Sequence, residues 1–161
     1  MNKKLNILAI DPGYDRCGVA VLEKHENKER LIFSHCIQTN KKDDFYTRIA
    51  EITDFIEKII QEYKPDILAI EKLYFNTNQK TAILVAQTSG AIISLALKNK
   101  MQIFEYTPLQ IKIATTGSGR ASKKELYEFL PKLIKIDKKI KLDDEYDAIA
   151  CALTCSASEK F

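Results

Sequence analysis

The sequence lacks the features that mark membrane, secreted and multidomain proteins. No apolar run reaches the roughly 18–20 residues that would cross a bilayer. Only short apolar stretches follow Lys3 and Lys4 before Asp11, so we expect no signal peptide. No repeat, low-complexity tract or linker interrupts the 161 residues. We therefore expect a single domain, residues 1–161, with a sizeable core and no membrane partner.

The four cysteines form no CxxC pair, and no histidine stands near them at zinc-ligand spacing. Cys151 and Cys155 are four residues apart on an expected helix, where they fit as small core residues. This use of cysteine favours a reducing compartment, and we expect the protein to be cytoplasmic.

Net charge is small, at +3, but it is unevenly distributed. Residues 1–97 hold 13 basic and 13 acidic side chains, whereas residues 98–141 carry a net charge of +7 and residues 142–161 a net charge of −4. A basic segment beside an acidic one suits a polyanionic substrate, because lysines hold phosphates while a metal neutralises carboxylates. On charge alone, a solvated lysine-rich face is the simpler interpretation.

The apolar pattern predicts alternating strands and helices. Strands are expected over residues 5–10, 19–22, 30–37, 67–70 and 102–105. Helices are expected over residues 44–63 and 81–97, after Thr107-Pro108, after the capping box Ser122-x-x-Glu125, and from Asp143 or Asp144. This order predicts an α/β fold: a mixed five-stranded sheet, three antiparallel strands then parallel strands, with helices on both faces. Gly90 inside the second helix predicts close packing against another backbone.

Four carboxylates stand where a metal-dependent nuclease needs them. Asp11 and Glu71 each end an apolar strand, which places them at the rim of a sheet rather than in its core. Asp144 and Asp147 share one face of the last helix and would repel each other without a cation between them. Asp143 and Asp147 are the alternative pair. Oxygen-only ligands suit Mg²⁺ or Mn²⁺, and paired hard cations suit phosphodiester hydrolysis.

Each of these motifs also has a purely structural interpretation. Asp11 could cap the turn at Pro12-Gly13, and Asp143 could cap the last helix. Glu71 is harder to explain in this way, because a core strand rarely ends in an acid that faces its own C-terminal crevice. The four acids together favour a shared site.

Five segments, in this order and at this spacing, carry a family resemblance: Leu8–Gly13 with Gly18, Ala69–Phe75, Tyr106–Lys112, Gly117–Lys123 and Asp144–Ala150. They resemble the RuvC-type Holliday-junction resolvases of the ribonuclease H-like superfamily, from about Ile7 to Leu153. The sequence departs from that pattern at Gln87–Gly90, where an arginine motif is expected, and at Cys17, where threonine is usual.

The resemblance implies a ribonuclease H-like fold and a structure-selective DNA endonuclease. It implies that Asp11, Glu71, Asp144 and Asp147 are the metal-binding catalytic carboxylates, and it favours Asp144 over Asp143. Two Mg²⁺ ions per active site are implied, with Mn²⁺ able to substitute. Paired nicks would leave 5′-phosphate and 3′-hydroxyl ends.

The resemblance also implies DNA contacts and partners. Lys112 and Lys123 would contact phosphates near the scissile bond, and Tyr74 would act against bases at the crossover of a four-way junction. Each of the three also has a simpler interpretation as a surface or core residue. The family works as a homodimer, and the helix over residues 81–97 could line that contact or be buried in the monomer. A branch-migration motor complex is an implied partner, in homologous recombination and DNA repair.

Three other functions can be weighed against this one. An RNA–DNA hybrid nuclease could use the same fold and the same acids. An actin-like phosphotransferase needs two such domains around a nucleotide, and this chain is too short for that. A non-catalytic junction-binding module would have no reason to keep all four acids.

Overall fold

The computed structural model describes residues 4–26, 28–73 and 78–161. At its centre is a five-stranded sheet in the order β3-β2-β1-β4-β5. Its strands are β1 (Leu5–Asp11), β2 (Arg16–His25), β3 (Lys28–Gln38), β4 (Ile67–Glu71) and β5 (Gln102–Tyr106). The β1–β2 and β2–β3 pairs are antiparallel, whereas β1–β4 and β4–β5 are parallel. The predicted mixed sheet is confirmed.

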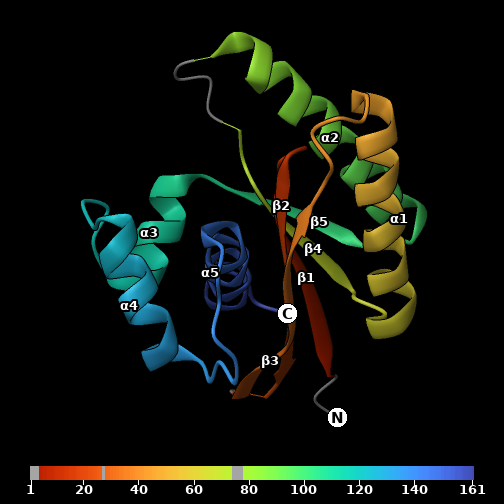
Figure 1. Cartoon of the computed structure of the whole chain (residues 1–161). Coiled ribbons are helices and arrows are strands. Elements are labelled where there is room, and N and C mark those ends of the chain that lie inside the picture. The colour runs from red at the N-terminus through yellow and green to blue at the C-terminus, as the bar shows by residue number, and fades with distance from the viewer. Residues whose placement is uncertain (1–3, 27, 74–77) are drawn as a thin grey trace.

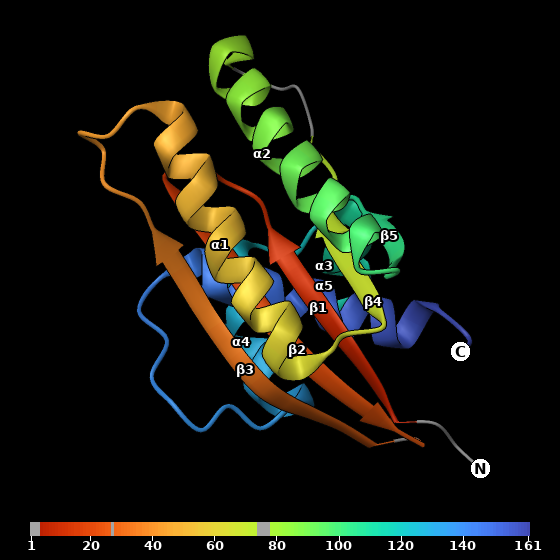
Figure 2. The same cartoon turned by 90° about the vertical axis from the view of Figure 1, so that its right-hand side faces the viewer.

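Helices cover both faces of this sheet (Figure 1). The helices are α1 (Phe45–Tyr63), α2 (Gln79–Lys98), α3 (Pro108–Thr116), α4 (Lys123–Leu133) and α5 (Asp143–Ser158). Figure 2 shows α1 and α2 in front of the sheet, with α3, α4 and α5 behind it. Alternate residues of β1 therefore enter two hydrophobic cores: Leu8 and Ile10 pack towards α1 and α2, whereas Ile7 and Ala9 pack towards α5.

Helix α5 lies directly on the sheet because its inner face is made of small residues. Ala148, Ala150 and Ala152 are fully buried, as are Cys151 and Cys155, which confirms that these cysteines are core residues. At Gly18 on β2, a Cβ would overlap the carbonyl oxygen of Asp144. This close approach sets the first turn of α5 against β2, near the carboxyl end of β1.

Most element boundaries lie within two residues of the prediction, and two elements have starts that the structure explains. Strand β2 begins earlier, at Arg16, because its pairing with β3 continues as far as Arg16 opposite Gln38. Helix α2 also begins earlier, at Gln79, because the side chain of Asn78 accepts hydrogen bonds from two backbone amides of the first turn.

Helix α2 is more exposed than its composition suggests. Ile83 and Leu97 are 56% and 58% exposed, and nothing described lies within 4 Å of where a Cβ on Gly90 would stand. The predicted close approach at Gly90 is therefore not made by the described part of the chain. By length and composition alone, α2 is the one described helix that could cross a membrane. In this structure 22% of its most apolar 18-residue stretch is buried. One such helix is weak evidence, because core helices of water-soluble proteins pass the same test.

Candidate active site

Asp11 and Glu71 lie side by side at one edge of the sheet. They are the last residues of β1 and β4, which are parallel neighbours with Ile10 opposite Ile70. The four residues before each acid are buried, whereas the acids themselves are partly exposed. Each strand therefore runs through the core and ends with a carboxylate at the sheet rim, as predicted.

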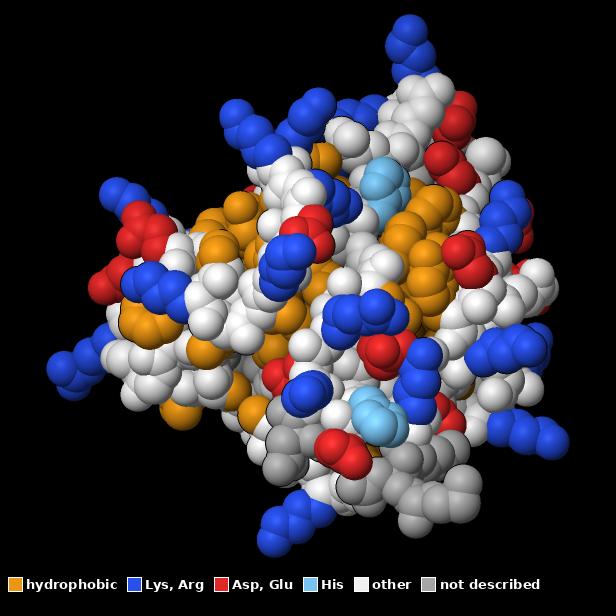
Figure 3. Space-filling model, turned by 90° about the horizontal axis from the view of Figure 1, so that it is seen from below, with side chains coloured by type: hydrophobic (Ala, Val, Ile, Leu, Met, Phe, Trp, Pro, Cys, Tyr) orange, Lys and Arg blue, Asp and Glu red, His pale blue; other side chains and the backbone are white. Residues whose placement is uncertain are grey.

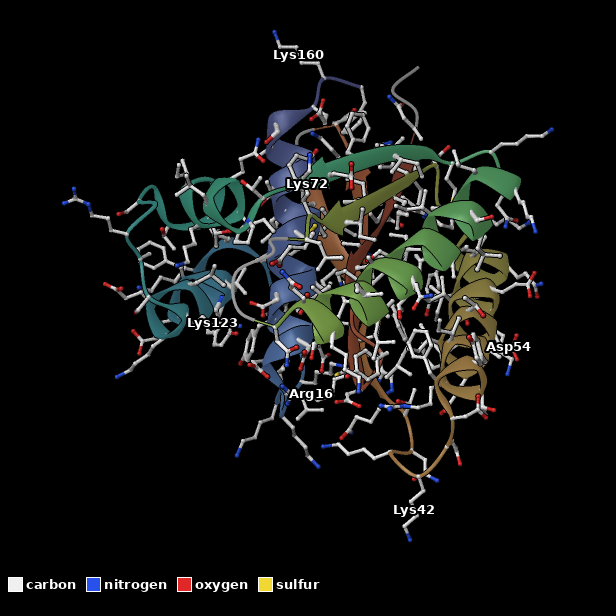
Figure 4. All side chains as sticks on the ribbon, turned by 90° about the horizontal axis from the view of Figure 1, so that it is seen from above. Arg16, Lys42, Asp54, Lys72, Lys123 and Lys160 are labelled. Carbon is white, nitrogen blue, oxygen red and sulfur yellow. The ribbon has the colours of Figure 1, made fainter. Side chains whose placement is uncertain are left out.

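Asp144 and Asp147 reach the same region from the first turn of α5. The carboxylate of Asp144 accepts from Nε of Arg16, 3.0 Å away at the start of β2. The carboxylate of Asp147 accepts from Nζ of Lys123 at 3.0 Å and from the hydroxyl of Tyr127 at 3.2 Å, both on α4. Three parts of the chain, β2, α4 and α5, thus meet through these two acids. Figure 4, seen from above, shows Arg16 and Lys123 near this end of α5.

The electrostatics show that the four acids share one poorly solvated space. Burial raises the pKa of Asp11 well above its usual value, and the charges of Glu71, Asp147 and Asp144 raise it further, while Lys123 opposes them. Burial and then Asp147 raise the pKa of Glu71 to about 7. The region therefore holds more negative charge than its own cations balance.

The donor set fits a hard divalent cation. It offers carboxylate oxygens from the ends of two strands and from one helix. The thiol of Cys36 lies 3.9 Å from Oδ2 of Asp144, but burial raises its pKa to about 12, so it stays a neutral thiol and a poor ligand. No group of three or more His, Cys, Asp or Glu side chains among the described residues is already gathered as a metal site. Arg16 and Lys123 instead neutralise the α5 acids. A bound metal would have to replace or share these ion pairs.

The structure separates Asp143 from Asp144. Helix α5 has Leu142 at its N-cap position, so Asp143 is its first helical residue. The interpretation of Asp143 as the helix cap is therefore wrong. The Asp143 side chain is 43% exposed and pairs with Arg16 at 3.1 Å, whereas that of Asp144 is 18% exposed. The charge of Asp144 is also one of those that raise the pKa of Asp11. Asp144 therefore faces the other acids.

The lysines identified from the sequence differ in position. Lys123 is the first residue of α4, after the predicted capping box at Ser122 and Glu125. Although burial disfavours its charge, its hydrogen bond to Asp147 raises the pKa of Lys123, which stays cationic. Lys112 lies in the middle of α3 and is half-buried, with no ion pair to another described side chain. Tyr74 lies outside the residues that the structure describes.

Sequence reasoning missed several side chains that contact or support the site. Arg16 stands only five positions after Asp11, and Tyr127 is four positions after Lys123 on the same face of α4. Arg48 of α1 is 7% exposed and donates to the carbonyl oxygen of Tyr14 at 3.2 Å, which holds the turn after β1. The spacing of Tyr127 from Lys123 was a signal that could have found it.

Comparisons with known proteins point to one family. The family model described as "Crossover junction endodeoxyribonuclease RuvC" matches residues 7–155. Relatives with that description from Petrotoga mobilis and Finegoldia magna are 45% and 39% identical, covering 91% and 98% of this chain and 90% and 96% of their own. The solved structure titled "T. thermophilus RuvC in complex with Holliday junction substrate" matches with a TM-score of 0.87 and 25% identity, over 94% of this chain and 93% of that one.

Proposed function

Because the chain belongs to the RuvC family of crossover junction endodeoxyribonucleases, we propose that it resolves four-way DNA junctions by paired nicks that depend on divalent metal ions. The observation that carries this proposal is the cluster of Asp11, Glu71, Asp144 and Asp147 at one sheet edge. The reaction class follows from the family. The residues that perform it are inferred from the cluster.

The acids have separate tasks in this mechanism. Asp11 and Glu71, fixed at the ends of two buried strands, form the rigid half of the metal site. Asp144 and Asp147 complete it from α5. These four carboxylates would hold two Mg²⁺ ions, or Mn²⁺ in their place, which would supply Lewis-acid activation of water and charge stabilisation for the leaving 3′-oxygen. The products are a 5′-phosphate and a 3′-hydroxyl that a ligase can join.

Cations around the site would hold the DNA. Lys123 is bound to Asp147, and a metal at Asp147 would free its ammonium group for a phosphate near the scissile bond. Lys112 has no described ion pair to give up, and it projects from the helix that follows β5, whose carboxyl end lies at the same edge as Glu71. Tyr74 keeps its inferred role against junction bases.

A two-fold dimer would place two such sites on one junction. The exposed side of α2 is a suitable contact surface, because no charged residue lies between Lys80 and Lys98. Its exposed residues recur at helical spacing: Ile83, Ala86, Gln87, Gly90, Ser94 and Leu97. Gly90 would allow a second α2 to approach closely. The protein would act in the cytoplasm, with a branch-migration motor as its partner in recombination and repair.

A cleavage assay with three substrates tests this function. A synthetic four-way junction, a linear duplex of the same sequence and an RNA–DNA hybrid are each incubated with and without Mg²⁺. Resolution of the junction alone, and only with Mg²⁺, supports the proposal. Preferred cleavage of the hybrid would make the chain a ribonuclease H-type enzyme, and binding without cleavage would make it a junction-binding module.

A further inference from the structure

Glu145 stands between Asp144 and Asp147 in the sequence but points away from them. Its side chain is 8% exposed and contacts β3. β3 is an edge strand of the sheet and is separated from β1 by β2. It is therefore a buried carboxylate in the first turn of α5 that the metal site does not use. A buried carboxylate is costly unless it is hydrogen-bonded and paired, so its partners indicate its role.

Two partners, from two other segments, bind the same oxygen of Glu145. The hydroxyl of Ser34 on β3 donates to Oε1 at 2.6 Å, and Nζ of Lys138 lies 2.5 Å from Oε1. Lys138 also donates to the carbonyl oxygen of Ser34 at 2.5 Å. The three residues form a closed triangle, here called the Glu145 anchor, which joins β3, the α4–α5 connection and α5.

The anchor also protects an edge of the sheet. β3 is an edge strand, and its unpaired carbonyl groups face outwards. Lys138 satisfies one of them and draws the α4–α5 connection alongside β3. Seen from below (Figure 3), lysine and arginine side chains surround patches of hydrophobic side chains at this end of the molecule.

The first turn of α5 has few other restraints. Its N-cap residue, Leu142, offers no side-chain hydrogen bond. The pairs with Arg16 and Lys123 involve the same carboxylates that a metal would bind, so they weaken when the site is used. The contacts at Gly18, with the carbonyl oxygen of Asp144 and the Cβ of Ala148, are steric and set how near α5 lies. Two restraints stay intact when the acids exchange protein cations for metal: the Glu145 anchor and the stacking of Tyr146 on Tyr127 of α4, with ring centroids 4.8 Å apart. Of the two, only the Glu145 anchor joins α5 to the sheet.

We propose that Glu145 is a positioning residue that fixes the rotation of the first turn of α5, and thereby presents Asp144 and Asp147 to the metal ions. Ser34 and Lys138 act through Glu145 in the same role. The inference rests on the proposed metal-dependent function, and it adds residues on β3 and on the α4–α5 connection that touch neither metal nor DNA.

Metal affinity measured without substrate tests this role. Mn²⁺ binding is followed by calorimetry for the wild type, Glu145→Ala and Glu145→Gln, beside their melting temperatures. We expect Glu145→Ala to weaken Mn²⁺ binding several-fold, less than the roughly 10–100-fold typical of a group that hydrogen-bonds a ligand directly. Glu145→Gln keeps an acceptor for Ser34, so it should recover part of the loss. Unchanged affinity in Glu145→Ala would overturn the proposal.

A matched control lies at the other end of the same two elements. The hydroxyl of Ser156 on α5 donates to the carboxylate of Glu29 on β3. Glu29→Ala thus removes a serine–carboxylate bond between β3 and α5 far from the acids, and it should leave Mn²⁺ affinity unchanged. An equal loss of affinity in both variants would assign Glu145 to general packing. If Glu145→Ala does not fold, Ser34→Ala replaces it, with a smaller loss expected and an unchanged affinity overturning the proposal.

One reference variant separates this inference from the function on which it rests. Asp147→Asn removes a ligand outright and should abolish most Mn²⁺ binding. If Asp147→Asn binds Mn²⁺ as the wild type does, the proposed metal site is wrong. If Asp147→Asn loses binding while Glu145→Ala does not, the metal site stands and only the positioning role fails.

Discussion

At the scale of single residues, the charge balance of the acid cluster governs how the protein responds to metal and to pH. Two of its acids stand partly exposed at the ends of buried strands, and two are neutralised by Arg16 and Lys123. Without a bound cation, the carboxylates of such a cluster repel one another. Substitution of a single acid should therefore change both metal binding and the dependence of stability on pH.

The choice between Asp143 and Asp144 is decided by paired substitutions. Asp144→Asn should remove nearly all cleavage, because it takes away an anionic oxygen that faces Asp11. Asp143→Asn should retain most of the rate, because its exposed side chain mainly pairs with Arg16. Nicking rates on a four-way junction check this. Equal losses in the two variants would place both acids at the metal.

The raised pKa of Glu71 makes metal-free stability depend on pH. The folded protein holds the Glu71 proton up to about pH 7, whereas an ordinary glutamate releases it near 4.5. The stabilisation is therefore fully present below about pH 4.5 and is lost as the pH rises through about 7. The loss is at most about 3.5 kcal/mol, because one pKa unit corresponds to ~1.4 kcal/mol.

Glu71→Gln tests this dependence, because it cannot ionise. In the presence of a chelator, the variant should be more stable than the wild type at pH 8 and lose this advantage at pH 5. Added Mg²⁺ should reverse the order at pH 8. Urea unfolding at both pH values measures the difference, and a variant that is less stable than the metal-free wild type at pH 8 would contradict it.

The two lysines should show different combinations of effects. Lys112→Ala removes a cation with no described ion pair, so it should weaken junction binding and lower the log–log salt slope by about one unit. Lys123→Ala should have the same effect on the salt slope. It should also alter metal affinity, because Lys123 forms an ion pair with Asp147. Affinity measured across salt concentrations checks both, and an unchanged slope would assign that lysine to a solvated face.

Much of the site at this scale could be predicted, because a carboxylate directly after four apolar residues is visible in the sequence. The partners of those acids could not. Arg16 reaches Asp144, and Ser34 reaches Glu145, only because β2, β3 and α5 pack together. Sequence spacing carries no information about such distant pairs.

At the scale of elements, α5 determines where the site lies and α2 how two copies could meet. Small residues bring α5 onto the sheet, with Gly18 beneath its first turn. The periodicity predicted both helices. The exposure of Gly90 was not predictable, because a helical glycine at a backbone contact looks the same in sequence whether that contact is within the chain or with another one.

A charge placed on the outer side of α2 tests its proposed role in the dimer. Ile83→Glu should give a monomer in sedimentation experiments, because Ile83 is 56% exposed and would meet its symmetry mate in an uncharged contact. The monomer should still fold, and paired nicking should fall while the acid cluster still binds Mn²⁺. Tyr46→Glu, at an exposed aromatic residue of α1, is the matched control and should remain a dimer. A dimeric Ile83→Glu variant would move the interface elsewhere.

At the scale of the whole molecule, the sheet brings together residues that are far apart in the chain. Two parallel strand ends and one helix start converge from positions 11, 71 and 144–147. The strand order was predictable from chain connectivity, since short turns favour antiparallel pairs and helical crossovers favour parallel ones. The electrostatic coupling between the acids, which helps to raise the pKa of Glu71 to about 7, could not be predicted because it depends on the packed structure.

The most direct test of the account compares junction binding with junction cleavage for Asp11→Asn, Glu71→Gln and Asp147→Asn. Each change keeps the shape of the side chain and removes an anionic ligand, while binding depends mainly on phosphate contacts to lysine. Gel-shift affinity and nicking rate are measured on the same labelled four-way junction in Mg²⁺. We expect near wild-type affinity with no detectable nicking in all three variants. A variant that nicks at the wild-type rate would contradict the central role of its acid in catalysis.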